Sequence, residues 1–399
     1  MFSAQLGRTA LFARKAINMK RAREFINHVE LPALLVATAA TLMTAPIAAC
    51  GSSVTSSEGT SNTSAGLQED SEKNFNGPGH VLVSDQFNNR VIEMNRKGHI
   101  VWQFGLGPTD VSAASIVGVN DAQRVGSLTL MAGTGAPPGT EPNCAAGCAD
   151  NRVILVDEDG RTVWQYGQFG VTGAEDDQLN TPVQATYLPS HAVLITDQGN
   201  SRIIEISVKT RKIVWQYGMT GTPGIGPNQL NNPNAAELLE NHHILISDEN
   251  NNRAIEVDRN KNIIATFTAS GTLSGVAFAS RLENGNTLVT DSNNNRIVEV
   301  DSNDKIVWQY ATNGEKQSNA NPLPTRAVRL ANGHTLISDQ FNHRVIEVNH
   351  AGHIVTSYGK LNTPGYGTTN ASQGLNAPYD AKVVGDYTGL TPPFGRDFD

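Results

Sequence analysis

The stretch VLITDQGNSRIIEI at residues 193–206 decides the fold, because four further gap-free copies of its pattern occur along the chain. The other copies are VLVSDQFNNRVIEM at 81–94, ILISDENNNRAIEV at 244–257, TLVTDSNNNRIVEV at 287–300 and TLISDQFNHRVIEV at 335–348. Each copy sets D-x-x-N-x-R between two β-branched apolar runs, which is the pattern of two strands joined by a polar corner. Repetition at this period indicates a fold built from one supersecondary unit.

A sixth unit lies between the first two copies. Asp85 and Asp197 are 112 residues apart, whereas the later corner aspartates follow one another at 43 to 51 residues. The gap contains LTLMAG at 128–133, a long insertion, and then Asp150-Asn151-Arg152 followed by VILVD. We read this as a sixth copy whose strands are intact and whose corner is degenerate.

Each unit reads as four short strands, for example VQATYL, VLITD, RIIEIS and KIVWQYG in the copy around Asp197. Four-stranded units at this period predict an all-β fold, a six-bladed β-propeller. A small residue recurs in the predicted inner strands, where blades converge on the axis: Ala185, Ala236, Ala279, Ala327 and Ala381.

The two chain ends predict how the ring closes. The first copy begins at its second strand, Val81, and the last copy is followed by LNAPYDAKVV, which matches the inner-strand segments LNTPVQATYL and LNNPNAAELL. Residues 378–384 should therefore supply the inner strand of the first blade. Such closure removes exposed sheet edges.

Composition and charge narrow the classes of partner. The chain has 399 residues with 37 Gly, 17% charged residues and a formal net charge of −8. Without residues 1–49 the balance is 24 basic against 36 acidic residues. A net negative surface opposes phosphate backbones, so we expect no nucleic-acid partner.

The N-terminal segment is predicted to be a targeting signal. Residues 31–49 read LPALLVATAATLMTAPIAA and follow Lys20, Arg21 and Arg23, a basic region before an apolar one. This order is typical of an export signal. Two prolines and the small residues at its end argue against a permanent transmembrane helix.

The end of this segment, Ile47-Ala48-Ala49-Cys50, resembles the lipobox of bacterial lipoproteins. The resemblance implies a signal peptide at 1–49 and a Cys50 that carries acyl chains and anchors the chain to a bacterial membrane. The alternative is an ordinary cleavage site with an incidental cysteine. A Ser/Thr-rich stretch, 50–76 with Cys50, should be a disordered linker before the propeller at 77–384 and a tail at 385–399.

The remaining cysteines, Cys144 and Cys148, lie close together in sequence. In an exported protein they are expected to form a small disulfide loop. A zinc site would need two further ligands, and none lies nearby in the sequence. A redox-active pair usually has two intervening residues rather than three.

Repeats with an inner strand, a V-x-D strand, D-x-x-N-x-R and a further apolar strand resemble NHL repeats over about residues 77–384. The I-V-W-Q-Y outer strands also resemble bacterial propellers grouped as quinoprotein-like or arylsulfotransferase-like. The NHL resemblance implies a six-bladed fold. It leaves function open, because NHL members include protein-binding modules, RNA binders, sensor domains and lyases.

The repeated polar and aromatic residues are predicted to serve the scaffold, because a set copied from blade to blade performs a task in each blade. Asp and Asn of the corner should satisfy turn backbone groups, and its Arg should pair with the Asp. The recurring tryptophans of the outer strands should pack between blades: Trp102, Trp164, Trp215 and Trp308.

Histidines recur at the first hairpin of separate blades: His80, His191, His243 and His334. A ring of imidazoles could bind a metal, but no carboxylate partners that would orient the rings are evident in the sequence. We therefore favour solvated turn residues, and predict no metal site, no cofactor and no catalytic residue.

Function is expected where the repeat varies, in the long loops between blades, in the cysteine insertion and at the channel positions Gln184, Arg326 and Asp380. Arg326 and Asp380 lie on adjacent blades, so they form either an ion pair or part of a polar ligand pocket. We predict a membrane-anchored extracytoplasmic binding or scaffold module whose long-loop face takes an envelope protein, glycan or small ligand. The alternative is a propeller enzyme, a lyase or hydrolase, with its site at the channel mouth.

Overall fold

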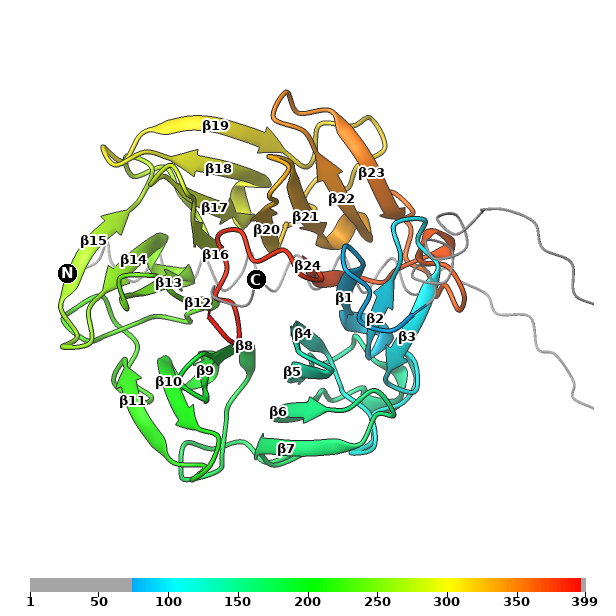
Figure 1. Ribbon diagram of the computed structural model, residues 1–399, viewed down its shortest axis with the longest axis horizontal. Coiled ribbons are helices and arrows are strands. Elements are labelled where there is room, and N and C mark those ends of the chain that lie inside the picture. The colour runs from blue at the N-terminus through cyan, green and yellow to red at the C-terminus, as the bar shows by residue number, and fades with distance from the viewer. Residues whose placement is uncertain (1–73, 396–399) are drawn as a thin grey trace, which may run out of the picture. The chain divides into compact units, whose positions relative to one another are not determined.

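The computed structural model describes residues 74–395, which form six four-stranded antiparallel sheets set like blades around a central axis (Figure 1). The prediction of an all-β, six-bladed propeller is therefore confirmed. The predicted signal segment and Cys50 lie outside the described residues. Within residues 74–395, no helix has the length and apolar character needed to cross a membrane.

The first three blades contain the following strands, each given from the inner strand outward. Blade 1 is β24 (Pro378–Val383), β1 (Val81–Asp85), β2 (Arg90–Met94) and β3 (Ile100–Phe104). Blade 2 is β4 (Val119–Val125), β5 (Leu128–Ala136), β6 (Cys148–Val156) and β7 (Thr162–Gly167). Blade 3 is β8 (Pro182–Leu188), β9 (Ala192–Asp197), β10 (Arg202–Ser207) and β11 (Ile213–Tyr217).

The other three blades repeat the order. Blade 4 is β12 (Ala235–Leu238), β13 (Ile244–Asp248), β14 (Arg253–Val257) and β15 (Ile263–Phe267). Blade 5 is β16 (Val276–Arg281), β17 (Thr287–Asp291), β18 (Arg296–Val300) and β19 (Ile306–Ala311). Blade 6 is β20 (Arg326–Arg329), β21 (Thr335–Asp339), β22 (Arg344–Val348) and β23 (Ile354–Gly359).

Short 3₁₀ helices connect some of these strands. Five of them form the D-x-x-N-x-R corners: η1 (Gln86–Asn88), η3 (Gln198–Asn200), η4 (Glu249–Asn251), η5 (Ser292–Asn294) and η6 (Gln340–Asn342). The helix η2 (Pro142–Cys144) lies in the insertion of blade 2, and η7 (Ala371–Gln373) lies between β23 and β24.

The ring closes as the sequence predicts. Strand β24, near the C-terminus, pairs antiparallel with β1, with Ala381 opposite Val83 and Val383 opposite Val81. This pairing ties the two ends of the described chain together and leaves blade 1 with the same four strands as the others.

The corner motif performs the expected scaffold task. In blade 3, Asp197 Oδ2 accepts from Asn200 Nδ2 at 2.7 Å and from Arg202 Nε at 2.7 Å. Asp197 Oδ1 accepts from the backbone N–H of Asn180, in the connection that enters the blade, at 2.8 Å. Ser201 completes the corner with a φ of 55°. The motif thus fixes the corner and the inter-blade connection beside it.

Blade 2 makes equivalent contacts with a carboxylate that comes from its third strand. Gly133 occupies the register position of the corner Asp opposite Arg152. Asp150 on β6 accepts from Arg152 Nε at 2.6 Å and from the backbone N–H of Val117 at 2.7 Å. A Cβ atom at Gly133 would lie 2.6 Å from the Asp150 carboxyl carbon, so the glycine makes room for the substitute carboxylate.

The outer-strand tryptophans join neighbouring blades, as predicted. Trp102 Nε1 donates to the carbonyl of Glu158 in the next blade at 2.8 Å, and the other three tryptophans make the equivalent bond. Blade 6, which has no tryptophan, uses Tyr358 Oη to donate to the carbonyl of Arg96 in blade 1 at 3.1 Å.

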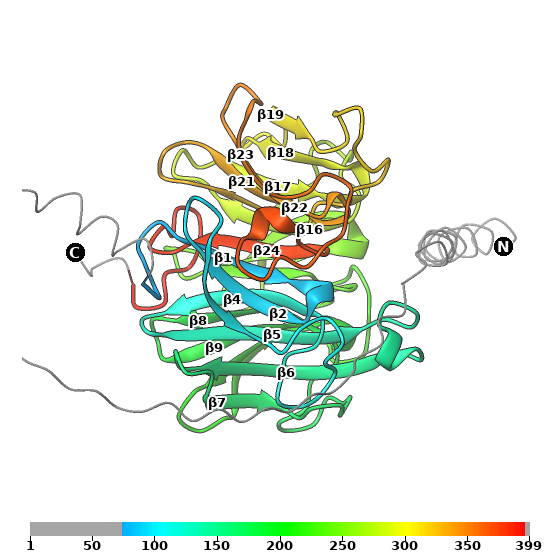
Figure 2. The ribbon, with the colours of Figure 1, turned by 90° about the vertical axis from the view of Figure 1, so that its right-hand side faces the viewer.

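The propeller has two distinct faces. The face with the D-x-x-N-x-R corners, the β5–β6 extension and the long connections between blades is called the loop face here. The opposite face, with the turns after each inner strand, such as 189–191, is called the turn face. Figure 2 shows the red C-terminal segment on one side of the ring and the far end of β5 and β6 on the other.

Candidate functional site

The axis of the ring is lined by the residue that precedes the recurring alanine of each inner strand. These residues, all buried, are Asp380, Asp121, Gln184, Ala235, Phe278 and Arg326 in blade order. The predicted site residues Gln184, Arg326 and Asp380 therefore lie at one level around the axis. Asp121 belongs to the same level but escaped the sequence reading, because the unit that carries it has a degenerate corner.

The charged groups at this level, together with Lys382 from the adjacent level, neutralise one another. Arg326 lies 2.6 Å from Asp121 (Nη2 to Oδ1) and 2.9 Å from Asp380 (Nε to Oδ1), so Arg326 and Asp380 are ion-paired. Lys382 Nζ lies 2.6 Å from both Asp121 Oδ1 and Asp380 Oδ2. The Arg326 guanidinium also lies 4.1 Å from the centre of the Phe278 ring. Two cations and two anions thus fill the axis where a ligand pocket was the alternative.

Burial affects the two carboxyls differently. Burial raises the pKa of Asp121 to about 6, against the attraction of Lys382 and Arg326 and with the help of the Asp380 charge. For Asp380, burial is outweighed by Lys382 and Arg326, so its pKa is lowered. Ionisation is therefore less favourable for Asp121 than for Asp380 in this network.

Gln184 is engaged on both sides of its amide. Its Nε2 donates to Glu237 Oε1 at 2.7 Å, and its Oε1 accepts from the backbone N–H of Ala236 at 2.8 Å. Glu237 and Lys382 occupy the position that follows the recurring alanine, one level nearer the turn face. The alternation of side chains along a strand was the signal that could have identified both residues from the sequence.

At its loop-face end the axis is bridged by two side chains from opposite blades. Tyr379 of blade 1 and Asn234 of blade 4 are hydrogen-bonded through the Tyr379 hydroxyl, at 3.0 and 3.1 Å (Figure 1 shows the opposed blades). Burial raises the pKa of Tyr379, so the phenol stays neutral and can donate to Asn234.

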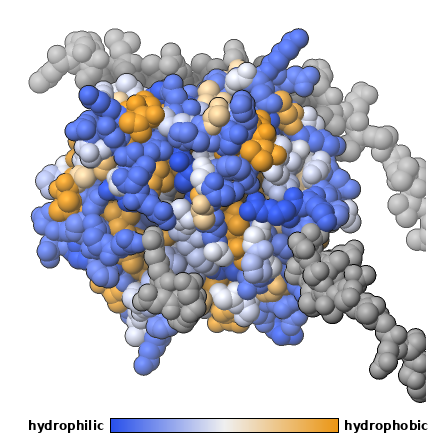
Figure 3. Space-filling view, turned by 45° about the horizontal axis from the view of Figure 1, so that its top comes forward, coloured by the Kyte–Doolittle hydropathy of each residue, from blue (hydrophilic) through white to orange (hydrophobic). Residues whose placement is uncertain are grey.

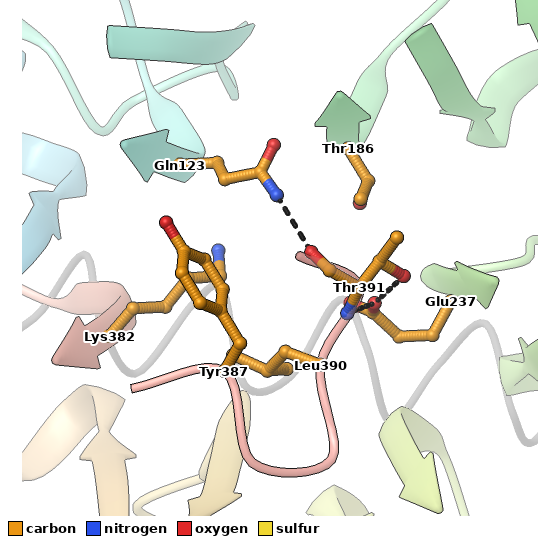
Figure 4. Close-up of a pocket in the computed structure, with 7 residues that line it drawn as sticks. All are labelled: Gln123, Thr186, Glu237, Lys382, Tyr387, Leu390 and Thr391. Atoms are coloured by element: carbon orange, nitrogen blue, oxygen red, sulfur yellow. Dashed lines mark hydrogen bonds between the residues drawn. The ribbon is translucent and has the colours of Figure 1, made fainter. Parts of the chain in front are cut away.

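At its turn-face end the axis is closed by the segment after β24 (Figure 4). Thr391 of this segment is bonded to Glu237 and Gln123, and Leu390 is buried beside it. The cavity that remains beneath has a volume of about 10 Å³, which is room for about one water molecule.

Exposed apolar side chains of the loop face lie in the connections between blades. Leu106 (70% exposed) follows β3, Met219 (46%) and Ile225 (64%) lie between β11 and β12, and Tyr366 (38%) lies between β23 and β24. These connections are long and differ from one another, as the sequence indicates.

A second group of exposed apolar residues occupies one register position of the outer strands. Its members are Val163, Val214, Ile264, Val307 and Val355. On the side shown in Figure 3, hydrophobic residues (orange) form small separate groups in a mainly hydrophilic surface.

The turn histidines do have carboxylate partners, contrary to the expectation from sequence. His80, His243 and His334 each place Nδ1 2.7 Å from the Glu of the third strand in their own blade: Glu93, Glu256 and Glu347. The partner lies 13 residues later, across two strands, and only the folded sheet brings the pair together. His191 instead contacts Tyr187 Oη at 3.2 Å.

These pairs recur from blade to blade, and some extend to the neighbouring blade. Arg281 of blade 5, for example, lies 2.9 Å from Glu256 of blade 4. Among residues 74–395, no three His, Cys, Asp or Glu side chains gather closely enough to hold a metal ion.

Cys144 and Cys148 lie at the tip of the β5–β6 extension on the loop face. Their Cα atoms are 5.8 Å apart and their sulfur atoms are joined as a disulfide. The extension thus places a short cross-linked loop among the inter-blade connections.

Comparison with known proteins identifies relatives by family and by fold. The family model PQQ_2, described as outer membrane protein assembly factor BamB, matches residues 54–310, well over half of the chain. No curated protein matches the sequence. The match is not to an NHL model, so the NHL likeness of the repeats stays a resemblance of motifs.

Two solved structures are among those that resemble this chain. A protein of unknown function from Bacteroides caccae is 16% identical, with a TM-score of 0.50 over 74% of this chain and 97% of that chain. Virginiamycin B lyase from Staphylococcus aureus is 14% identical, with a TM-score of 0.43 over 72% of this chain and 85% of that chain. At such identities the likeness concerns the fold alone.

Proposed function

The chain belongs to the PQQ_2 family, described as outer membrane protein assembly factor BamB, and from this premise we propose that it is an envelope scaffold that binds a protein partner through its loop face. The partner would take part in assembling outer membrane proteins. The observation that carries the choice of face is the set of exposed apolar residues on the inter-blade connections. Large apolar side chains exposed on loops that differ from one another are typical of protein-binding surfaces.

The axis supports a surface role over a channel role. The charged side chains that line it are ion-paired with one another, and both of its ends are closed by side chains or by the C-terminal segment. The alternative, a lyase or hydrolase at the channel mouth, would need one of these closures to open before a substrate could reach the polar groups. A glycan or small ligand at the same mouth would face the same requirement.

Anchoring completes the proposal. Lipidation of Cys50 would attach the propeller to a bacterial membrane, and the Ser/Thr-rich stretch over residues 51–73 would give it reach, because Phe75 and Asn76 already contact blades 1 and 2. A tethered scaffold meets membrane-associated partners at a raised effective concentration.

The experiment compares apolar residues of the two surfaces in cells that lack the wild-type protein. Met219→Asp with Ile225→Asp changes the loop face. The matched control, Val163→Asp with Val214→Asp, changes two similarly exposed residues (54% and 59%) on outer strands. We expect cells with the loop-face double variant to contain several-fold less folded outer membrane β-barrel protein than cells with the wild-type protein. Cells with the control variant should contain the wild-type amount.

The partner is identified with a photoreactive residue placed at position 225 and, as a control, at 214. The proposal predicts one dominant cross-link to a protein of the outer membrane assembly machinery from position 225 only. A loop-face double variant that complements fully, or equal cross-linking from both positions, would rule out the loop face as the binding surface.

A further inference from the structure

The segment that follows the closing strand enters the turn-face end of the axis. Residues 385–395 cross the centre of the ring (red in Figure 1) after β24 has completed blade 1. Leu390 packs against Ala235, Phe278 and Val328, which come from three consecutive blades. The ring of strands is complete without this segment, so the segment occupies a mouth rather than a place in a sheet.

Thr391 is held through all three of its polar atoms. Its backbone N–H donates to Glu237 Oε2 at 2.9 Å, and its hydroxyl donates to the same oxygen at 2.6 Å. The hydroxyl accepts from the backbone N–H of Leu238 at 3.0 Å, and the Thr391 carbonyl accepts from Gln123 Nε2 at 3.1 Å (Figure 4). Hydrogen bonds of this kind, to both the main chain and the side chain, are how a binding site recognises a peptide residue.

The groups that hold Thr391 are themselves fixed by the blades. Gln184 Nε2 orients Glu237 at 2.7 Å, and the backbone N–H of Tyr187 orients Gln123 through its Oε1 at 2.7 Å. Glu237 is buried, and Thr391 supplies both hydrogen bonds to its Oε2 atom. Without the segment, Glu237 Oε2 and the Gln123 amide would face the opening without these partners, and a ligand or water would have to replace the lost hydrogen bonds.

We propose that the turn-face end of the axis is a peptide-binding site, and that Leu390–Thr391 occupies it as an internal ligand. The site selects an apolar residue for the Ala235–Phe278–Val328 pocket, followed by a hydroxyl residue that donates to Glu237. A residue that precedes proline favours the extended backbone conformation, so Pro392 favours the conformation in which Thr391 is bound. The competing ligand is therefore an extended apolar-Thr-Pro segment of another protein.

The test frees the internal ligand after the whole chain has folded. A site-specific protease sequence is inserted between Gly385 and Asp386, where a Cβ atom on Gly385 would meet nothing within 4 Å. The folded chain is nicked and the released segment is removed by dialysis. Binding of a labelled peptide with the sequence of residues 388–394, TGLTPPF, is then measured by fluorescence anisotropy.

We expect saturable binding of this peptide to the nicked chain. A Val peptide, in which Val replaces the Thr that corresponds to Thr391, lacks the charge-assisted hydrogen bond from the hydroxyl to Glu237. This replacement should weaken binding about tenfold or more. Glu237→Gln in the protein should also weaken binding of the Thr peptide, and it should weaken binding of the Val peptide less, because the Val peptide donates only its backbone N–H to this side chain.

Three results would overturn the proposal: no binding by a folded nicked chain, equal binding of the Thr and Val peptides, or unfolding of the chain when the segment leaves. The last would show that the segment is part of the core. A second measurement uses the intact chain with Leu390→Ala and Thr391→Val, whose weakened internal segment should allow the free peptide to bind where the wild-type chain excludes it. If this variant is folded and excludes the peptide as the wild type does, the site is not a peptide site.

Discussion

His343 links the stability of the closed ring to pH. Its Nδ1 atom accepts a 3.1 Å hydrogen bond from the backbone N–H of Ala377, which enters the closing strand β24. The same corner position carries an Asn in four of the other five blades, and its Oδ1 accepts from the start of the next blade, as Asn252 does from Gly275 at 2.9 Å. Only an unprotonated imidazole nitrogen can accept, so protonation of His343 breaks the contact at the seam of the ring.

Burial lowers the pKa of His343 to about 4, whereas an unfolded His titrates near 6.5. Between these values the unfolded chain binds more protons than the folded one, so stability falls as the pH is lowered through this window. The two pKa values give a loss of about 2 kcal/mol at pH 5 and about 3 kcal/mol in the limit below pH 4, relative to pH 8.

Two substitutions separate the titration from the contact. His343→Asn keeps an acceptor at a φ of 55°, a conformation that Asn adopts readily, and it does not titrate. His343→Gly adopts the same φ without strain and has no acceptor. We expect His343→Asn to match the wild type at pH 8 and to exceed its stability by about 2 kcal/mol at pH 5. His343→Gly should be less stable than His343→Asn by about 1 kcal/mol at both values.

The assay is urea unfolding at pH 8 and pH 5, followed by tryptophan fluorescence and far-UV circular dichroism. Coincidence of the two transitions justifies the use of a single free energy of unfolding. If the wild type and His343→Asn lose the same stability between pH 8 and pH 5, His343 does not carry the pH dependence and the reasoning is wrong.

Two further predictions concern the axis and the anchor. Arg326→Met leaves Asp121 and Asp380 buried with a single cation, so we expect a loss of about 3 to 5 kcal/mol in unfolding free energy. Adding Asp121→Asn restores charge balance with Lys382 and should recover more than half of that loss; no recovery would show that the guanidinium acts through packing on Phe278. Cys50→Ser should move the protein from the membrane fraction to the soluble fraction and abolish labelling by a palmitate analogue, and continued labelling would contradict the lipid anchor.

The fold followed from the sequence because its signals are local and repeated. The alternation of β-branched residues specifies each strand, and the D-x-x-N-x-R corner specifies how two strands meet. Ring closure was readable as well, since LNAPYDAKVV carries the inner-strand pattern at the far end of the chain.

The candidate site was predicted only in part. Arg326 and Asp380 stood out because they occupy an inner-strand position whose residue type differs from blade to blade. The structure shows that the two residues meet at the axis. Asp121 was missed because the unit that carries it lacks the corner used for alignment. The His80–Glu93 pair was missed because its two residues approach each other only across two strands of a sheet.

The sequence by itself determined the number of blades, the order of their strands and the seam at which the ring closes, because each depends on short patterns that repeat. Only the tertiary structure decided that the axis is filled, since this depends on which side chains of non-adjacent blades reach one another. Arg326 reaches Asp121 two blades away, Tyr379 reaches Asn234 across the ring, and Thr391 reaches Glu237 from a segment outside the repeat. No periodicity encodes such contacts, because they arise from the radius of the closed ring and the lengths of individual side chains.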